Sequence, residues 1–202
     1  YVLVGDDFSY GAKRAGNYAT LDEAGRGSGF DVARMMSYEV HGLRVSSSAV
    51  REALQAGDMA QAEALLGRPY AISGHVQHGR KLGRELGFRT LNVRFAHPRP
   101  AAGGIFVVAV EGLGQQPLAG VASLGVRPTV VDLGRVLLET HVFDWPASLP
   151  PEAGYGRVVR VRLLHKLHDE RKYPSLDALR EGIAADTATA RAWWSARPTS
   201  RN

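Results

Sequence analysis

Six short strand-like segments follow residue 69, and glycine- or proline-containing turns separate them. No segment between them has the length and period of the helix that a parallel crossover needs. The sequence therefore predicts an antiparallel sheet, and closing this sheet into a small barrel would leave no exposed edge strand. The predicted strands are residues 70–78, 91–95, 105–110, 118–124, 136–143 and 157–164.

A helical segment separates the predicted barrel from the first part of the chain. Asp58, with Gln61 three residues later, resembles a capping box, and apolar residues follow at helical spacing. Gly67 and Pro69 end this helix, because glycine is a common helix stop and proline disfavours helical geometry in the residue before it. We therefore expect two domains and a short tail, which cover residues 1–66, 67–194 and 195–202.

The last predicted helix covers residues 175–194. Ser175 fits the N-cap position, and Leu179, Ile183 and Ala190 form one apolar stripe at helical spacing. A helix with one apolar stripe needs a surface to cover that stripe. We expect it to pack on the barrel.

The first 45 residues follow a different pattern, which is typical of an α/β domain. Residues 1–5 form a short apolar run that ends in glycine, which predicts a buried strand. Residues 20–40 indicate a helix and a further strand, with Gly25, Gly27 and Gly29 in the turn between them.

Three serines precede the next predicted helix, residues 48–56. Ser46, Ser47 and Ser48 supply an N-cap and several hydroxyl groups at the positive end of the helix dipole, and Arg51 follows one turn along. This arrangement suits a phosphate group. Serine N-caps are also routine in helices that bind no ligand, so the local pattern leaves both interpretations open.

The start of the predicted barrel carries a second candidate binding site. Gly79, Gly83 and Gly87 are spaced four residues apart among several cationic side chains, an arrangement that lets main-chain N–H groups approach an anion. Thr90 and Asn92 follow at i and i+2, so they share one face of an extended strand and are plausible ligands of a hard cation. The pattern suggests a Mg-nucleotide site, although glycine-rich turns with scattered cations are also common between strands.

The segment from Gly74 to Asn92 reads G-H-V-x-H-G-x-x-x-G-R-x-L-G-F-x-T-x-N. It resembles the signature of the riboflavin kinase module in the bacterial bifunctional riboflavin kinase/FAD synthetase family. GDDFSYG and VSSSAVR, near the N-terminus, resemble two segments of the adenylyltransferase module of the same enzymes. The H-x-G-H signature of the front half of that module does not occur in this sequence.

This resemblance covers residues 1 to about 192 and implies an α+β protein. Its C-terminal part would be a six-stranded antiparallel β-barrel with a terminal helix. The part before it would be the rear portion of an α/β Rossmann-like nucleotidyltransferase domain.

The resemblance also implies roles for individual residues. Glu139 falls on the glutamate of the family's L-E-x-H strand, which is taken as the general base, whereas the local pattern alone favours an exposed carboxylate. Thr90 and Asn92 would hold the metal. The implied ATP-binding residues are Gly74, His78, Gly79, Gly83, Arg84, Ser46, Ser47, Ser48 and Arg51. The implied flavin-binding residues are Phe88, Arg127, Glu170 and Arg171.

Two positions depart from the family pattern. In the family's P-T-A-N tetrad this chain has Arg89 in place of proline and Leu91 in place of alanine, which puts the metal geometry in doubt. In the family's R-x-E-x-K-F segment, His168 stands where an arginine is expected. The second change makes flavin affinity less secure than nucleotide binding.

Composition excludes some kinds of site. The formal net charge of +5 fits nucleic acid, anionic lipid or phosphorylated small molecules equally. The chain has no cysteine, which excludes disulfides and cysteine nucleophiles and favours a cytoplasmic protein. A zinc site from His75, His78 and His141 is not expected, because His75 and His78 have opposite parity on one strand. The chain starts with Tyr1 rather than Met, so we expect that an upstream segment has been lost.

We therefore expect an ATP-dependent riboflavin kinase, with FMN adenylyltransferase activity only in the intact parent protein. The predicted substrates are riboflavin, FMN and ATP, and the predicted cofactor is Mg²⁺. Neither nucleic acid nor a membrane is an expected partner. Two alternatives remain open: a fragment that binds flavin or nucleotide but turns over slowly, and a basic barrel whose glycine loop contacts nucleic-acid phosphates.

Overall fold

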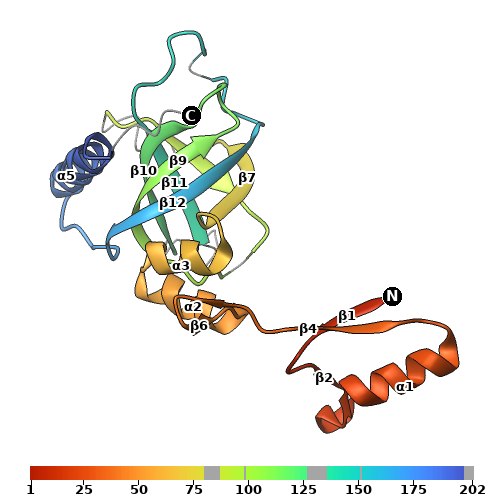
Figure 1. Cartoon of the computed structure of the whole chain (residues 1–202). Helices are drawn as coiled ribbons and strands as arrows, with labels where there is room; N and C mark the ends of the chain where they lie inside the picture. Colours follow the sequence, from red (N-terminus) through yellow and green to blue (C-terminus); the bar gives the residue numbers. More distant parts are fainter. Residues whose placement is uncertain (80–86, 98, 127–135, 151, 198–202) are drawn as a thin grey trace. The chain divides into compact units, whose positions relative to one another are not determined.

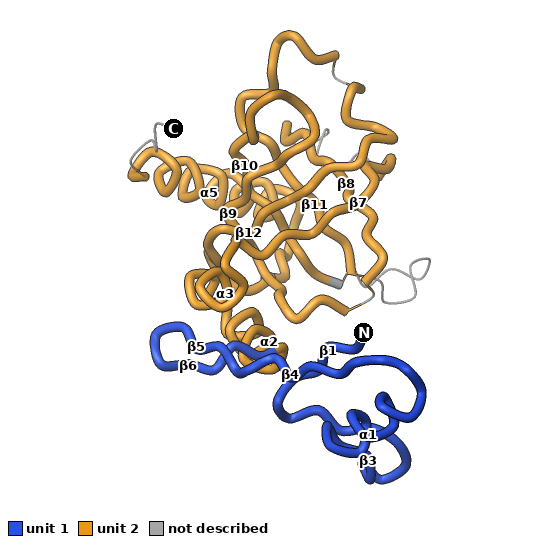
Figure 2. The backbone as a smooth tube through the Cα atoms, turned by 45° about the vertical axis from the view of Figure 1, so that its right-hand side comes forward, with its two compact units in different colours: residues 1–46 blue, residues 47–202 orange. Residues whose placement is uncertain are grey.

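The computed structural model describes residues 1–79, 87–97, 99–126, 136–150 and 152–197. The chain divides into two compact units, Tyr1–Ser46 and Ser47–Asn202 (Figure 2). The first unit contains a β-α-β segment, and the second contains two helices, a barrel and the C-terminal helix. None of the helices in these described ranges is long and apolar enough to cross a bilayer.

In the first unit, strand β1 (Val2–Gly5) pairs in parallel with β4 (Val32–Met35), and helix α1 (Tyr18–Ser28) lies between them in the chain. Short two-residue strands and one turn of 3₁₀ helix complete the unit. They are β2 (Ser9–Tyr10), η1 (Ala12–Arg14), β3 (Gly16–Asn17), β5 (Glu39–Val40) and β6 (Leu43–Arg44). Of β1 only Val4 is buried, so the prediction of a buried strand was wrong: among the described residues β1 pairs with β4 alone, in a two-stranded sheet.

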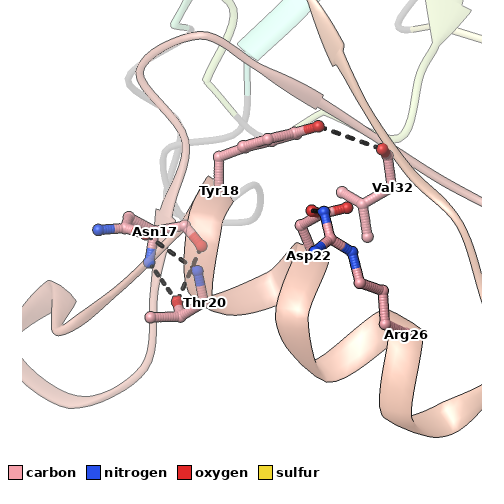
Figure 3. Close-up of polar contacts among 6 residues, drawn as sticks. All are labelled: Asn17, Tyr18, Thr20, Asp22, Arg26 and Val32. Atoms are coloured by element: carbon pink, nitrogen blue, oxygen red, sulfur yellow. Dashed lines mark hydrogen bonds and ion pairs between the residues drawn. The ribbon is translucent and has the colours of Figure 1, made fainter.

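Helix α1 begins at a capping box. The Asn17 side chain accepts a hydrogen bond from the Thr20 amide, and the Thr20 hydroxyl accepts one from the Asn17 amide (Figure 3). The helix runs through Gly25 and Gly27 and ends at Gly29, whose φ of 76° is left-handed. The prediction that all three glycines form a turn was therefore wrong for the first two. The Phe30 carbonyl oxygen would lie 2.5 Å from a Cβ at Gly25, so this position favours glycine even inside the helix.

The second unit begins with helices α2 (Ser47–Ala56) and α3 (Met59–Leu66). Asp58 caps α3 by accepting a hydrogen bond from the Gln61 amide, and Gly67, with a φ of 68°, ends it. Both features follow the prediction. Helix α3 lies against strand β12 (Val158–His168) of the barrel (Figure 1).

Six antiparallel strands form the closed barrel, as the sequence predicts. Their order around it is β10-β11-β8-β7-β12-β9, and β9 pairs back onto β10. Each overlaps one predicted strand, but β12 runs four residues beyond the predicted end at 164, with register shifts at 163/165 and 166/168. The other five strands are β7 (Ala71–Gln77), β8 (Thr90–Arg94), β9 (Gly104–Glu111), β10 (Leu118–Val126) and β11 (Val136–Val142).

Side chains alternate between the two faces of this sheet, because successive residues of a strand point to opposite sides. The interior is filled by fully buried side chains: Val76, Val93, Phe106, Val108, Val110, Leu124, Leu138, Val159, Val161 and Leu163. Burying a residue of this kind contributes about 1.5–3 kcal/mol. Thr140 also faces the interior, and its hydroxyl has no hydrogen-bond partner among the described residues.

Helix α5 (Leu176–Ser195) covers part of the outer face of the barrel. Ser175 is its N-cap and accepts a hydrogen bond from the Ala178 amide, as the sequence predicts. Ala190 is fully buried against Val107, Val121 and Phe143, and the Trp193–Trp194 pair packs around the same cluster. Leu179 and Ile183, which were predicted to share the apolar stripe, are half-buried.

Candidate functional site

A row of polar residues crosses the outer face of four neighbouring strands. Pairing places Ser123 of β10 opposite Glu139 of β11, Glu139 opposite Asn92 of β8, and Asn92 opposite Gln77 of β7. Opposite residues in antiparallel strands have Cβ atoms about 4.5–5.5 Å apart on the same face. The predicted base and one predicted metal ligand are therefore neighbours, although they lie 47 positions apart in the sequence.

The Asn92 carboxamide lies against the main chain at the start of the glycine-rich loop. A Cβ at Gly79 would lie 2.2 Å from Asn92 Nδ2, so only glycine leaves room for this side chain. The contact brings a loop residue that was predicted to hold phosphate next to the Asn92–Glu139 pair. Gly83 and Arg84, two further loop residues of the predicted ATP site, lie outside the described residues.

The neighbouring row along the strands pairs Thr90 with His141. His141 Nδ1 lies 2.8 Å from the Arg89 carbonyl oxygen, and the His141 ring meets that of Phe88 edge to face, with 5.5 Å between centroids. Thr90 is therefore on the same face as Asn92, as predicted. Phe88, a predicted flavin residue, is held beside this face by His141, which sequence reasoning gave no role.

The structure shows the contacts of the two residues that depart from the family pattern, Arg89 and Leu91. The Arg89 guanidinium carbon lies 5.9 Å from the centre of the Trp145 ring, while the Arg89 carbonyl oxygen faces His141. The Leu91 side chain is 5% exposed and faces the barrel interior, opposite to the side of Thr90 and Asn92. Leu91 therefore does not lie on the face of the predicted metal ligands, whose metal role stays a prediction.

Glu170 reaches this face from the segment that follows β12. The Ser123 hydroxyl donates a 2.8 Å hydrogen bond to Glu170 Oε1, and a Cβ at Gly125 would lie 1.9 Å from Glu170 Oε2. Ser123 therefore has two carboxylate residues as neighbours. Glu139 lies opposite it on the paired strand β11, and the Glu170 carboxylate lies over β10, at Ser123 and Gly125. Sequence reasoning missed Ser123, because its position opposite Glu139 depends on strand register.

An ion pair, Lys166–Asp169, lies beside Glu170 in the chain. Lys166 lies 2.6 Å from the Asp169 carboxylate, and this hydrogen-bonded ion pair holds the pKa of Asp169 below its usual value. Asp169 therefore stays ionised at neutral pH. Arg171, another predicted flavin residue, is exposed on the same segment.

Two predicted ATP residues in β7 and the loop after it have structural contacts of their own. A Cβ at Gly74 would lie 2.1 Å from the Arg94 carbonyl oxygen, so the close approach of the neighbouring strand explains this glycine. His78 stacks on Tyr155 with 3.8 Å between ring centroids. A nucleotide role for Gly74 and His78 stays a prediction, and Tyr155 is an aromatic neighbour that sequence reasoning missed.

The remaining predicted residues belong to other segments of the chain. Ser47, Ser48 and Arg51 belong to α2, and Ser46 is the last residue of the first unit. Their nucleotide role stays a prediction. Arg127, a predicted flavin residue, lies outside the described residues. Within the described ranges, no group of three or more His, Cys, Asp or Glu side chains is placed to hold a metal ion by itself.

Known proteins resemble this chain along most of its length. Residues 66–194 match the family model described as riboflavin kinase, and residues 1–49 match one described as FAD synthetase. A bifunctional riboflavin kinase/FMN adenylyltransferase from Escherichia coli K12 is 44% identical over 191 residues, which cover 95% of this chain and 59% of that protein. Its counterpart from Pseudomonas fluorescens is 45% identical over 192 residues, which cover 95% and 60%. The chain thus spans about three fifths of the relatives it matches.

A solved structure agrees with this match. A crystal structure from Streptococcus pneumoniae, described as a macrolide-efflux protein, aligns with a TM-score of 0.70 and 28% identity. The alignment covers 94% of this chain and 59% of that one. The fold described above is therefore shared with a protein of known structure.

Proposed function

The chain belongs to the riboflavin kinase family, and we propose that it transfers the γ-phosphoryl group of ATP to the primary hydroxyl of riboflavin, giving FMN. The observation that carries this proposal is the Asn92–Glu139 pair beside Gly79. Phosphoryl transfer to an alcohol needs alignment, charge neutralisation and an acceptor for the hydroxyl proton. The pair and its neighbours supply groups for each of these needs.

Glu139 is proposed as the general base. Its carboxylate is carried on a rigid strand, on the same face as Thr90 and Asn92. Deprotonation of the riboflavin hydroxyl by Glu139 would raise its nucleophilicity as the bond to phosphorus forms. Because β11 is bonded on both sides in a closed barrel, the position of this base is fixed before substrate binds.

Thr90 and Asn92 fit a magnesium ion. A hydroxyl and a carboxamide oxygen are hard, neutral ligands, and Mg²⁺ typically takes few protein groups and keeps phosphate and water ligands. When bound, Mg²⁺ would neutralise charge on the phosphates. The protein's part is to hold the two oxygens on one face, with the Asn92 carboxamide fixed against Gly79.

We place this activity in residues 67–194, within the cytoplasm, where ATP is available. The residues proposed for the flavin side, Phe88 and Glu170, reach the same outer face through His141 and Ser123. Conversion of FMN to FAD is proposed for the intact parent protein alone, because this chain lacks the H-x-G-H signature.

A chromatographic assay tests the proposal. The 202-residue chain is incubated with riboflavin, ATP and Mg²⁺, and riboflavin, FMN and FAD are separated and quantified. We expect FMN without FAD. Absence of FMN, with both substrates shown to bind, would refute the kinase assignment for this chain. Formation of FAD would refute the assignment of adenylyl transfer to the intact parent protein.

A further inference from the structure

The imidazole of His168 lies between two acceptors at the end of β12. Its Nδ1 lies 2.7 Å from the Asp169 carbonyl oxygen, and its Nε2 lies 2.7 Å from Asp186 Oδ1 on helix α5. A carbonyl oxygen and a carboxylate oxygen both accept hydrogen bonds. The ring satisfies both when each nitrogen carries a proton, which is the imidazolium form.

This contact is shielded and joins two elements. The His168 and Asp186 side chains are only 17% and 16% exposed, so bulk water competes weakly for their hydrogen bond. Helix α5 packs on the outer face of β9 and β10, while His168 ends β12. The pair therefore fastens the start of the connecting segment, residues 169–175, to a helix that the barrel itself holds.

The other end of the same segment also rests on α5. A Cβ at Gly182 would lie 2.4 Å from the Tyr173 hydroxyl oxygen, so the Tyr173 ring lies directly on the helix backbone. Glu170 is between these two supports, and its carboxylate extends to the Ser123 hydroxyl. The direction of Glu170 is thus set by His168 on one side and Tyr173 on the other.

Asp186 faces His168 from α5, and Asp169, its own neighbour in the chain, is paired with Lys166 of β12. From β9 the residue opposite His168 is Ile105, which does not titrate. Asp186 is the carboxylate that contacts the His168 ring directly.

We propose that His168, through its hydrogen bond to Asp186, is a positioning residue that aims Glu170 at the flavin. The flavin part of this inference rests on the proposed kinase function. Without the His168–Asp186 hydrogen bond the segment should loosen, so riboflavin binding should weaken. ATP binding and the chemical step should be insensitive to this change.

Steady-state kinetics of the full chain test whether His168 affects riboflavin binding. The variants are His168→Gln, whose shorter amide cannot keep both ring contacts, and His168→Arg, which keeps a donor that can reach Asp186. His165→Gln is the matched control, because His165 is exposed on the same strand and stacks on Trp193 instead. We expect the KM for riboflavin to be raised about tenfold in His168→Gln, and to stay close to the wild-type value in His168→Arg and in His165→Gln. The KM for ATP and kcat should not change.

Two measurements that need no turnover test whether His168 holds residues 169–173 in place. In ¹⁵N spectra of histidine rings, His168 Nε2 should carry a proton that is hydrogen-bonded to Asp186, with assignment from the His168→Arg spectrum. Amide hydrogen exchange in residues 169–173 should be faster in His168→Gln and Asp186→Asn than in wild type or His165→Gln.

The outcomes separate this inference from the kinase assignment. Unchanged exchange in both variants, or a wild-type KM profile in His168→Gln, would overturn the positioning role even if FMN is made. If exchange changes as expected but no variant or wild type makes FMN, the kinase assignment fails. The aim of Glu170 at a flavin then fails with it.

Discussion

Arg191 of α5 donates two hydrogen bonds of 3.0 Å to the carboxylate of Asp144, which lies two positions after the end of β11. The Arg191 guanidinium also lies over the Phe143 ring. The hydrogen bonds from Arg191 hold the pKa of Asp144 below its usual value. A lowered pKa in the folded state gives stability that is present at neutral pH and is lost as the pH falls through the folded pKa. This exposed ion pair fastens the helix to the strand that carries Glu139.

Asp144→Asn should lower the urea midpoint slightly at pH 7. The effect should shrink as the pH is lowered through the folded-state pKa of Asp144, because the wild-type carboxyl then becomes protonated too. Urea unfolding curves of both proteins at pH 7 and at acidic pH measure the difference. A larger effect at low pH than at pH 7 would contradict the assigned sign. Asp22→Asn, which removes the exposed Asp22–Arg26 pair in the first unit, is the control for a general charge effect.

Glu139→Gln should lower kcat for FMN formation by about 10²- to 10⁴-fold and leave ATP and riboflavin affinities nearly unchanged, because it removes the proton acceptor but keeps the shape. Steady-state rates and calorimetric titrations measure the two effects. Glu111→Gln is the control, since Glu111 lies on β9 and pairs with Arg162. A near-wild-type rate in Glu139→Gln would show that another group takes the proton.

Gly79→Ala should disable the site and leave the barrel folded. The new Cβ would lie 2.2 Å from Asn92 Nδ2, so the carboxamide must move, and a displacement of about 1 Å in a reacting assembly costs about a hundredfold in rate. Gly103→Ala is the matched control, because its Cβ would lie 3.7 Å from the Leu124 carbonyl oxygen, an ordinary contact. Equal rates of FMN formation for the two variants would show that the Gly79–Asn92 contact does not contribute to catalysis.

Asn92→Ala should raise the Mg²⁺ concentration needed for half-maximal rate, because one of the two proposed oxygen ligands is lost. Thr90→Ser keeps its hydroxyl and should need about as much Mg²⁺ as wild type, whereas Thr90→Val should resemble Asn92→Ala. Metal titrations of FMN formation at saturating ATP give these values. The ligand assignment fails if all three variants titrate like wild type.

Thr140→Val should stabilise the protein by about 1 kcal/mol, because it removes a buried hydroxyl that has no hydrogen-bond partner. Thr140→Ser keeps the hydroxyl and removes a methyl group, so it should destabilise. Thermal and urea unfolding of the two variants decide the point. Destabilisation by valine would mean that the hydroxyl is satisfied by a buried water.

The barrel was predictable because its strands alternate and their turns contain glycine or proline. The two errors in the first unit have local causes. Gly25 and Gly27 were read as turn residues, but the Asn17–Thr20 capping box starts a helix that runs through them. Strand β1 was read as buried from its apolar residues, but exposure depends on what covers a strand, which composition does not tell.

The sequence proposed the candidate site residues one by one, and their spatial arrangement came only from the structure. The spacing of Thr90 and Asn92 correctly placed both on one face. The register that sets Glu139 opposite Asn92, and Ser123 opposite Glu139, comes from pairing between distant segments. The same holds for His168, which the sequence showed as a departure from a pattern and the structure shows in contact with Asp186.

Alternate residues of strand β8 face opposite sides of the barrel wall and are therefore under different constraints. Leu91 and Val93 face the barrel interior and are constrained by packing, while Thr90 and Asn92 face outward, where the proposed metal site would constrain them. Random substitution confined to the odd positions should therefore yield variants that differ in melting temperature but share one metal requirement. Libraries confined to the even positions should do the reverse, so thermal tolerance and catalysis can be tuned separately within five consecutive residues.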